Sequence, residues 1–188
     1  METRLYFVRH AHSIYTPDEL ERPLSERGVK DAERVTELLK KESINQVVSS
    51  PYRRAVQTVE GIAYLIGKEI EIVNDLRERK LSGEAMEDFQ AAITSVWEDE
   101  NFSWEGGESN LKAQQRGVSA ALHLLEKYPG KNIVVGTHGN IMVLIMNYFA
   151  SRYDFQFWQN LEMPDIYQLT FKGTDLLKVK KGWKRSNA

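Results

Sequence analysis

Short, apolar-rich segments alternate with amphipathic helical segments along most of this chain, and that alternation limits the folds it can adopt. Residues 5–8, 46–49 and 132–136 are apolar-rich runs of strand length. Such runs are typical of strands that are buried on both faces of a parallel sheet. Strands that alternate with helices form an α/β domain in which helices cover the sheet. The sequence therefore predicts an α/β fold, a three-layer α/β/α sandwich with a mostly parallel central sheet.

The apolar spacing and the capping residues indicate where the helices lie. One helix face is predicted from the apolar stripe Val29, Ala32, Val35 and Leu39. Ser50 and Pro51 predict the start of a second helix, with Ser50 as its N-cap and Pro51 in the first turn. Gly67 is suited to end that helix, because glycine readily adopts the left-handed conformation of a C-cap.

Further elements are predicted in the second half of the chain. Residues 69–73 alternate between polar and apolar, as an edge strand does, and a long helix is marked by Val118, Ala121, Leu122 and Leu125. A very apolar helix is predicted over residues 141–148, and a hairpin over residues 166–171 and 176–179. The lysines of the last hairpin strand suit a solvated sheet edge, where charge discourages pairing with another chain. We expect a single domain over residues 1–188.

Residues 80–107 differ in character from the segments around them. They are acidic, aromatic and rich in turn residues, with Trp97, Phe102 and Trp104 followed by Gly106-Gly107. We expect this stretch to be a partly helical, cap-like insertion at one end of the sheet, with its aromatic side chains packed beneath it.

The composition excludes several classes of protein and site. The 188 residues carry a formal charge of −2 and contain no cysteine. A charge balance near neutral argues against a nucleic-acid binder, and the lack of cysteine excludes thiol nucleophiles and cysteine-ligated metals. No signal peptide is evident, and no apolar run reaches the roughly 20 residues that span a bilayer. We therefore expect a cytoplasmic protein that acts without nucleic acid or membrane.

Three polar loops directly follow the three predicted buried strands. These loops are Arg9-His10-Ala11-His12-Ser13, Ser49-Ser50-Pro51-Tyr52-Arg53-Arg54-Ala55 and Thr137-His138-Gly139-Asn140. Ligands of open α/β sheets bind at the carboxyl ends of strands, where such loops meet. The sequence therefore predicts an anion pocket in which arginines surround a histidine that can act as a nucleophile.

Phosphoryl transfer accounts for these residue types. Arginine binds phosphate oxygens bidentately, and a neutral imidazole can attack phosphorus to form a phosphohistidine. Flanking arginines keep the attacking histidine neutral, and a second histidine held protonated by bound phosphate stabilises the developing charge. A carboxylic acid must also protonate the leaving oxygen. Glu78, which follows the predicted edge strand, is the candidate for that acid.

The three loops resemble the motifs of the histidine phosphatase superfamily, which includes the cofactor-dependent phosphoglycerate mutases. The resemblance is carried by Val8-Arg9-His10-Ala11-His12-Ser13, Ser50-Pro51-Tyr52-Arg53-Arg54-Ala55-Val56-Gln57-Thr58 and Thr137-His138-Gly139-Asn140, in that order. It implies a phosphoglycerate mutase-like fold over nearly the whole chain. It also implies that His10 is phosphorylated, that Arg9, Arg54 and His138 complete the phosphate pocket, and that Glu78 is the acid. Arg53 is expected to be a solvated residue outside the pocket.

Several positions depart from the family pattern. Ala11 and Thr16 stand where members usually carry Gly and Asn, and Thr16 lies where the contact to phosphate is expected. Gly83 comes one residue later than the pattern places it, so Glu84 is an alternative acid. The mutase-like Glu-Arg-His-Tyr-Gly run is absent, and the chain is shorter than typical mutases. Both facts favour a phosphatase over a mutase.

The sequence thus predicts a metal-independent phosphomonoesterase of the histidine acid phosphatase type, which needs no cofactor and acts on a small phosphorylated metabolite. Ser13, Thr16, His12 and Asn140 are expected to join the pocket arginines and His138 in binding substrate. Three alternatives stay open: a phosphoglycerate mutase-type phosphotransferase, a metal-dependent hydrolase that uses His10 and His12, and a non-catalytic binder of phosphorylated ligands. The sequence leaves the physiological substrate and the oligomeric state undetermined.

Overall fold

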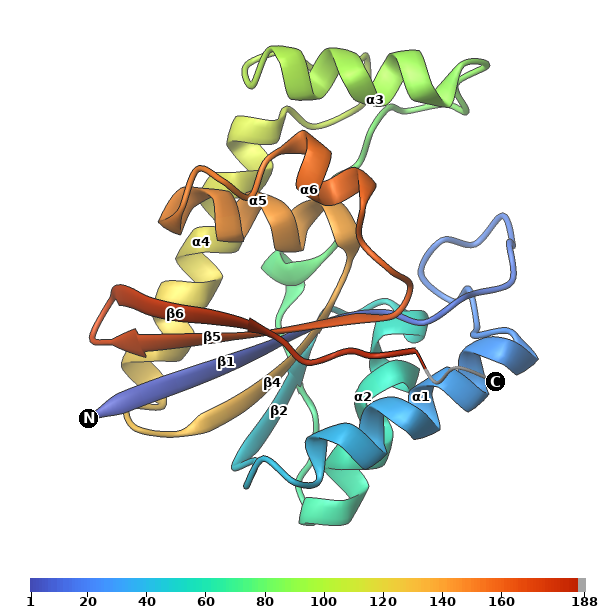
Figure 1. The fold of residues 1–188 in the computed structure, drawn as a ribbon. Helices are drawn as coiled ribbons and strands as arrows, with labels where there is room; N and C mark the ends of the chain where they lie inside the picture. The colour runs from blue at the N-terminus through green and yellow to red at the C-terminus, as the bar shows by residue number, and fades with distance from the viewer. Residues whose placement is uncertain (186–188) are drawn as a thin grey trace.

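A six-stranded sheet forms the centre of the protein, with helices on both of its faces (Figure 1). The computed structural model describes residues 1–185. The strands are β1 (Glu2–Arg9), β2 (Gln46–Ser49), β3 (Glu71–Ile72), β4 (Asn132–Thr137), β5 (Asp165–Lys172) and β6 (Asp175–Lys181). The helices are α1 (Glu26–Leu39), α2 (Arg53–Ile66), the 3₁₀ helix η1 (Asn74–Leu76), α3 (Phe89–Glu98), α4 (Asn110–Lys127), α5 (Gly139–Phe149) and α6 (Phe155–Gln159).

The strand order is β3-β2-β4-β1-β5-β6, and the first four strands of that order are parallel. Strand β5 runs antiparallel to β1, and β6 runs antiparallel to β5 at the edge. The register pairs Arg9 with Thr137, and Ser49 with Gly136. The carboxyl ends of β1, β2 and β4 therefore meet at one edge of the sheet, as the sequence predicts.

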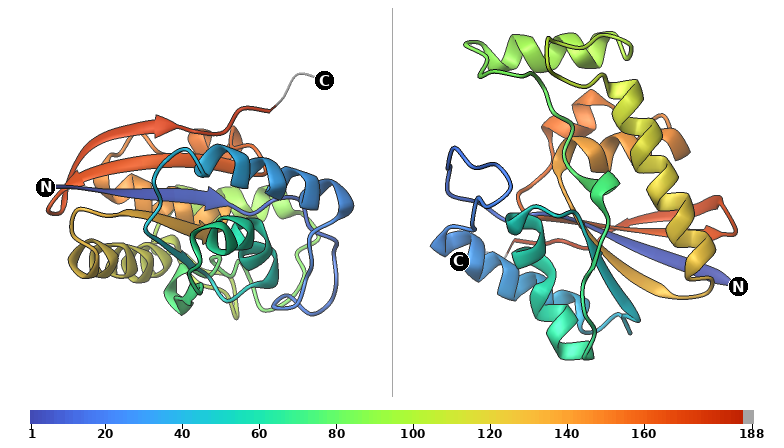
Figure 2. Two further views of the ribbon diagram at one scale, coloured as in Figure 1. Left: turned by 90° about the horizontal axis from the view of Figure 1, so that it is seen from below. Right: turned by 180° about the vertical axis from the view of Figure 1, so that it is seen from behind.

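Each buried strand contributes alternate side chains to two separate hydrophobic cores. Leu5 and Phe7 pack with α4 and α5 on one face, and Tyr6 and Val8 pack with α1 and α2 on the other. Figures 1 and 2 show the same division, with α1 and α2 at the lower right of the sheet in Figure 1, α5 above the strands, and α4 running down behind them from above. Because a strand exposes successive residues to opposite faces, two helical layers are needed to cover apolar strands. The three-layer prediction is confirmed.

Two local predictions from the sequence are wrong. Val29 is 46% exposed, and the buried face of α1 is formed by Gly28, Ala32, Val35 and Leu39. Ser50 does not cap α2, which begins at Arg53 with Tyr52 at the N-cap and no side-chain cap. The Ser50 hydroxyl lies before the helix, where it accepts from Tyr52 N at 3.3 Å and shares a hydrogen bond with His138 Nε2. Gly67 does end α2 in the left-handed conformation, with φ of 64°.

The segment from 80 to 107 carries α3, which lies beyond α5 and α6 and away from the sheet (Figure 1). Its aromatic residues pack as expected, since Phe102 contacts Trp104 edge-on and Trp104 donates a hydrogen bond to the Ala92 carbonyl. Trp97 stacks on Phe155 of α6, a short helix that the sequence analysis did not predict. Across the residues that the structure covers, we find no helix of the length and apolarity that crossing a membrane requires.

Candidate active site

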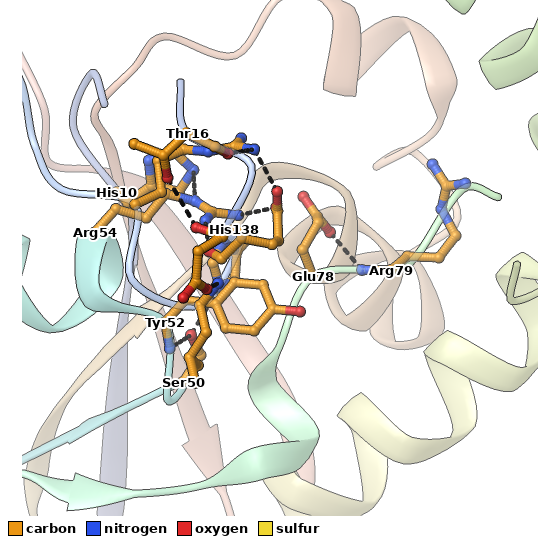
Figure 3. Close-up of polar contacts among 12 residues, drawn as sticks. His10, Thr16, Ser50, Tyr52, Arg54, Glu78, Arg79 and His138 are labelled. Atoms are coloured by element: carbon orange, nitrogen blue, oxygen red, sulfur yellow. Dashed lines mark hydrogen bonds and ion pairs between the residues drawn. The ribbon is translucent and has the colours of Figure 1, made fainter. Parts of the chain in front are cut away.

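The three loops that follow β1, β2 and β4 bring two histidines together at the edge of the sheet. His10 follows β1 and His138 follows β4, and their ring centroids lie 5.2 Å apart in an edge-on arrangement. Arg54 comes from the first turn of α2, which starts just beyond β2. In the view of Figure 3, His10 and Arg54 lie on one side of His138 and Glu78 lies on the other.

The protonation state of His10 follows from its hydrogen bonds. Its Nδ1 lies 2.7 Å from the Ala11 carbonyl oxygen, which can only accept, so Nδ1 carries the proton. Its Nε2 accepts a hydrogen bond of 3.3 Å from Arg54 Nε and therefore presents a lone pair. Burial, reinforced by Arg54, Arg9 and Arg22, lowers the pKa of His10 to about 3. His10 is thus a neutral imidazole with its Nε2 lone pair facing an arginine.

Ser50 holds His138, a contact that the sequence analysis missed. The Ser50 hydroxyl and His138 Nε2 share a hydrogen bond of 2.7 Å, and both residues are fully buried. Burial and the neighbouring His10 and Arg54 lower the pKa of His138 well below its usual value. His138 Nδ1 is buried and has no hydrogen-bond partner among residues 1–185. The sequence around Ser50 could not reveal this hydrogen bond to His138, because a serine at that position also fits the pattern of a helix N-cap.

Two depressed histidine pKa values make the stability of the free protein sensitive to acid. The unfolded chain binds protons at His10 and His138 below about pH 6.5, whereas the lowered pKa values mean that the folded protein binds them only at lower pH. The free energy of unfolding should therefore fall as the pH drops from 6.5 towards 3. As the pH falls from 6 to 4, the free energy of unfolding should decrease more steeply for the wild type than for His10→Ala. We expect the difference in slope to be about 1.4 kcal/mol per pH unit. Urea titrations at several pH values measure this difference, and equal slopes would contradict it.

Arg54 contacts His10, whereas Arg9 lies beside Gly139, the residue that follows His138. Arg54 is 4% exposed, and its guanidinium also lies 4.8 Å from the centre of the Tyr52 ring. Arg9 donates from Nη1 to the Leu161 and Glu162 carbonyls at 3.4 and 3.2 Å. Its guanidinium lies so close to Gly139 that a Cβ there would come within 2.9 Å of Nε. Burial lowers the pKa of Arg9, and Glu78 and Asp165 oppose that effect.

Arg22 is a third arginine at the site, and the sequence analysis did not identify it. It lies in the loop between β1 and α1, donates from Nη2 to the Thr16 carbonyl at 3.2 Å, and contributes to the low pKa of His10. Arg22 could not be assigned from the sequence, because it lies in a loop that has no helix or strand periodicity. Only the folded loop brings Arg22 back towards His10. The positive charge of Arg22 did not by itself indicate a role in the site, because arginines are common in exposed loops.

Three of the buried polar atoms without a hydrogen-bond partner within the described part of the chain are Arg9 Nε, Arg22 Nε and His138 Nδ1. Buried donors are normally paired, so unpaired ones at a common site call for a ligand or water. Two cationic donors and an imidazole suit a tetrahedral oxyanion, because charge-assisted hydrogen bonds to such an ion are strong. The site can therefore bind a phosphoryl group beside the His10 Nε2 lone pair.

Glu78 lies at the start of α5, where its carboxylate accepts three backbone hydrogen bonds. Oε1 accepts from Arg79 N at 2.8 Å and Ile141 N at 2.9 Å, and Oε2 accepts from Asn140 N at 3.0 Å. The free N–H groups at a helix start favour this position for a carboxylate. Each carboxylate oxygen has two lone pairs, so Oε2 can still exchange a proton with a ligand. Glu84, in contrast, is exposed on the segment that leads to α3.

The remaining predicted ligands have other partners in this structure. Thr16 donates its hydroxyl to the Asp18 carbonyl, Ser13 pairs with Leu24 in an isolated bridge, and the exposed His12 hydrogen bonds to Ser25. Asn140 Oδ1 accepts hydrogen bonds from Arg79 Nη2 and Trp97 Nε1. These four positions stay predictions as substrate contacts. Arg53 is exposed, as expected.

Neither His10 nor His12 forms part of a larger group of metal-binding side chains. Residues 1–185 contain no cluster of three or more His, Cys, Asp or Glu side chains arranged to hold a metal ion. His10 Nδ1 is bonded to the Ala11 carbonyl, His10 Nε2 to Arg54 Nε and His12 Nδ1 to the Ser25 hydroxyl, so three of their four ring nitrogens already have protein partners.

The sequence matches a family model and a known relative over most of its length. The model of the histidine phosphatase superfamily (branch 1) matches residues 5–177. Phosphoglycerate mutase-like protein 4 from Arabidopsis thaliana is 33% identical over 156 residues, which cover 72% of this chain and 66% of the relative. The chain therefore matches just under two thirds of that relative's length.

Solved structures of two phosphatases share the fold. A mycobacterial glucosyl-3-phosphoglycerate phosphatase superposes with a TM-score of 0.78 at 22% identity, covering 99% of this chain and 100% of the other. The phosphoserine phosphatase of Entamoeba histolytica, solved with 3-phosphoglyceric acid, gives a TM-score of 0.80 at 18% identity over 97% and 98% of the two chains. Since the family match extends over most of the sequence and includes the loops that carry His10, Arg54 and His138, this chain belongs to the histidine phosphatase superfamily.

Proposed function

We propose that this protein hydrolyses phosphomonoesters through a phosphohistidine on His10, without a metal ion. The observation that carries the proposal is the state of His10, a neutral imidazole whose Nε2 lone pair faces Arg54. The unpaired donors of Arg9 and Arg22 support a phosphoryl group at that position. Arginine charge can do there what a metal ion does in other phosphatases, which is to neutralise the phosphate oxygens.

The proposed reaction has two steps. In the first, the His10 Nε2 lone pair forms a bond to phosphorus while the bond from phosphorus to the ester oxygen breaks, and Glu78 gives its proton to that oxygen. In the second, Glu78 takes a proton from water, whose oxygen attacks phosphorus and breaks the phosphorus–nitrogen bond. Inorganic phosphate leaves, and both His10 and Glu78 return to their starting states.

Substrate binding changes the charge state of His138 in this scheme. In the free protein His138 is kept neutral by burial and by the charges around it. A phosphate dianion next to it adds negative charge, which favours the imidazolium. A protonated Nδ1 can then donate to an equatorial phosphate oxygen and stabilise the charge that builds there. Ser50 keeps the ring in place through Nε2.

We propose a small phosphorylated metabolite as the substrate and residues 80–107 as a cap that shapes access to the site. The structural relatives named above include a phosphatase of glucosyl-3-phosphoglycerate and a phosphoserine phosphatase, which supports a small substrate. The cap role is supported by Trp97, which links α3 to the start of α5 through Asn140 Oδ1. Asn140 is adjacent to the Glu78 carboxylate, which accepts from its backbone N–H.

Hydrolysis of p-nitrophenyl phosphate in excess EDTA tests the metal-independent part of the proposal. We expect the rate with EDTA to stay within about twofold of the rate without it, because the arginines supply the positive charge. A rate that disappears with EDTA and returns with a divalent ion would contradict the proposal and favour a metal site at His10 and His12. Isomerisation of a phosphoglycerate that depends on a bisphosphorylated primer, without hydrolysis, would instead favour a mutase.

A further inference from the structure

The carboxylate of Glu19 lies between two of the three arginines at the site. Its Oε1 accepts from Arg54 Nη2 at 2.8 Å, and its Oε2 pairs with Arg22 Nη2 at 2.5 Å. We propose that Glu19 is a positioning residue, which orients Arg54 and Arg22 for the phosphoryl group. This inference rests on the proposed function, and it assigns a role to a residue outside the three sequence motifs.

The contacts of Arg54 show which side of its guanidinium Glu19 holds. Nη1 donates to the Glu19 carbonyl at 2.9 Å and Nη2 donates to the Glu19 carboxylate, so one residue binds the far edge through both backbone and side chain. Nε, on the other edge, donates to His10 Nε2. A guanidinium has two edges that can bind an oxyanion bidentately. Glu19 therefore leaves the Nε edge of Arg54 facing the place where phosphorus must bond.

Arg22 is held in a similar way. Its Nη2 contacts both the Glu19 carboxylate and the Thr16 carbonyl, and its guanidinium lies 4.7 Å from the centre of the Tyr15 ring. Its Nε has no partner within the part of the chain that is described. Glu19 thus fixes the far ends of both arginines, while Arg54 Nε donates to His10 Nε2 and Arg22 Nε has no partner in the described part of the chain.

The loop that carries Glu19 is anchored to the rest of the fold. The Leu20 carbonyl accepts a hydrogen bond from Arg53 N at the start of α2, and Asp18 Oδ1 accepts from the backbone of Leu20 and Glu21. Glu19 is therefore presented from a fixed turn. The Glu19 side chain is 50% exposed, whereas that of Arg54 is 5% exposed, so losing the carboxylate leaves a buried guanidinium with fewer partners and lowers stability as well. Positioning is therefore tested by the recovery in Glu19→Gln, which keeps an oxygen for Arg54, and by the affinity for inorganic phosphate.

The experiment is a double-mutant cycle on Glu19 and Arg54, with Glu21→Ala as a matched control. Glu21 is an exposed carboxylate two residues away in the same loop. We expect Glu19→Ala to lower kcat/KM for p-nitrophenyl phosphate by about 10- to 100-fold, since small displacements of positioned groups have effects of this size. Glu19→Gln keeps an oxygen for Arg54 and should recover part of the loss. Glu21→Ala should stay within about twofold of the wild type.

Non-additivity separates positioning from a general effect on the loop. In the Arg54→Ala background, Glu19→Ala should change kcat/KM by less than about threefold, the part that remains coming through Arg22. The affinity for inorganic phosphate, measured by calorimetry, should follow the same pattern without requiring turnover. A full Glu19 effect in the Arg54→Ala background, or wild-type behaviour of Glu19→Ala in both assays, would overturn the inference. An inactive wild type whose phosphate affinity depends on Glu19 would reject the hydrolase and retain the positioning role.

Discussion

Replacing His10 with alanine should abolish hydrolysis while leaving the protein folded. Loss of a catalytic nucleophile lowers turnover by about 10⁴-fold or more, because the remaining binding groups can only assist attack by water. His10 is buried, and alanine leaves space beside Arg54 and His138, two polar groups that water can bind. The measurement is kcat for p-nitrophenyl phosphate, with the melting temperature and the circular dichroism spectrum recorded on the same samples.

His123→Ala is the matched control for this prediction. His123 lies on α4, is exposed, and belongs to none of the three motif loops. It should retain activity within about twofold of the wild type, because surface substitutions away from a site have small effects. Substantial turnover by a folded His10→Ala protein would exclude His10 as the nucleophile. Radiolabelled substrate, quenched rapidly under alkaline conditions, should leave phosphate on the wild type and none on His10→Ala.

The alternation of strands with helices and the residues that follow the buried strands could be predicted because both depend on local sequence. An apolar run followed by Arg9-His10 or Thr137-His138 signals a strand end, and parallel strands bring their ends to one edge. The predicted strand at 46–49 has the observed bounds of β2. The two histidines and Arg54 could therefore be assigned to one site before the fold was known.

The parts that escaped prediction depend on contacts between segments distant in sequence or on irregular loops. Ser50 reads as an N-cap in isolation, and its bond to His138 arises only because β2 and β4 are neighbours. Glu19 and Arg22 lie in a loop whose shape is set by the Asp18 turn and by the pairing of Ile14 with Pro23. The direction of a side chain in such a loop depends on the hydrogen bonds of the loop. The periodicity of apolar residues, which predicts helices and strands, does not predict those hydrogen bonds.

Glu78→Gln should lower hydrolysis of an alkyl phosphate by about 10²- to 10⁴-fold, the usual contribution of a general acid. An alkoxide leaves poorly without a proton, whereas p-nitrophenolate leaves readily, so the loss should be much smaller for p-nitrophenyl phosphate. Glutamine also places an NH₂ group against the N–H donors at the start of α5, where Glu78 accepts from Asn140 and Ile141. We expect a cost of about 1–3 kcal/mol in the free energy of unfolding from that mismatch.

The dependence on the leaving group is what identifies Glu78 as the acid, and Glu84→Gln is its control. A residue that only caps α5 would, when replaced, reduce both substrates equally, since a displaced helix start disturbs His138 and the arginines alike. A proton donor gives a loss that grows as the leaving oxygen becomes more basic. Glu84 is exposed on the segment before α3, and Glu84→Gln should leave both rates within about twofold of the wild type. A loss that depends on the leaving group in Glu84→Gln, with equal losses in Glu78→Gln, would transfer the acid role to Glu84.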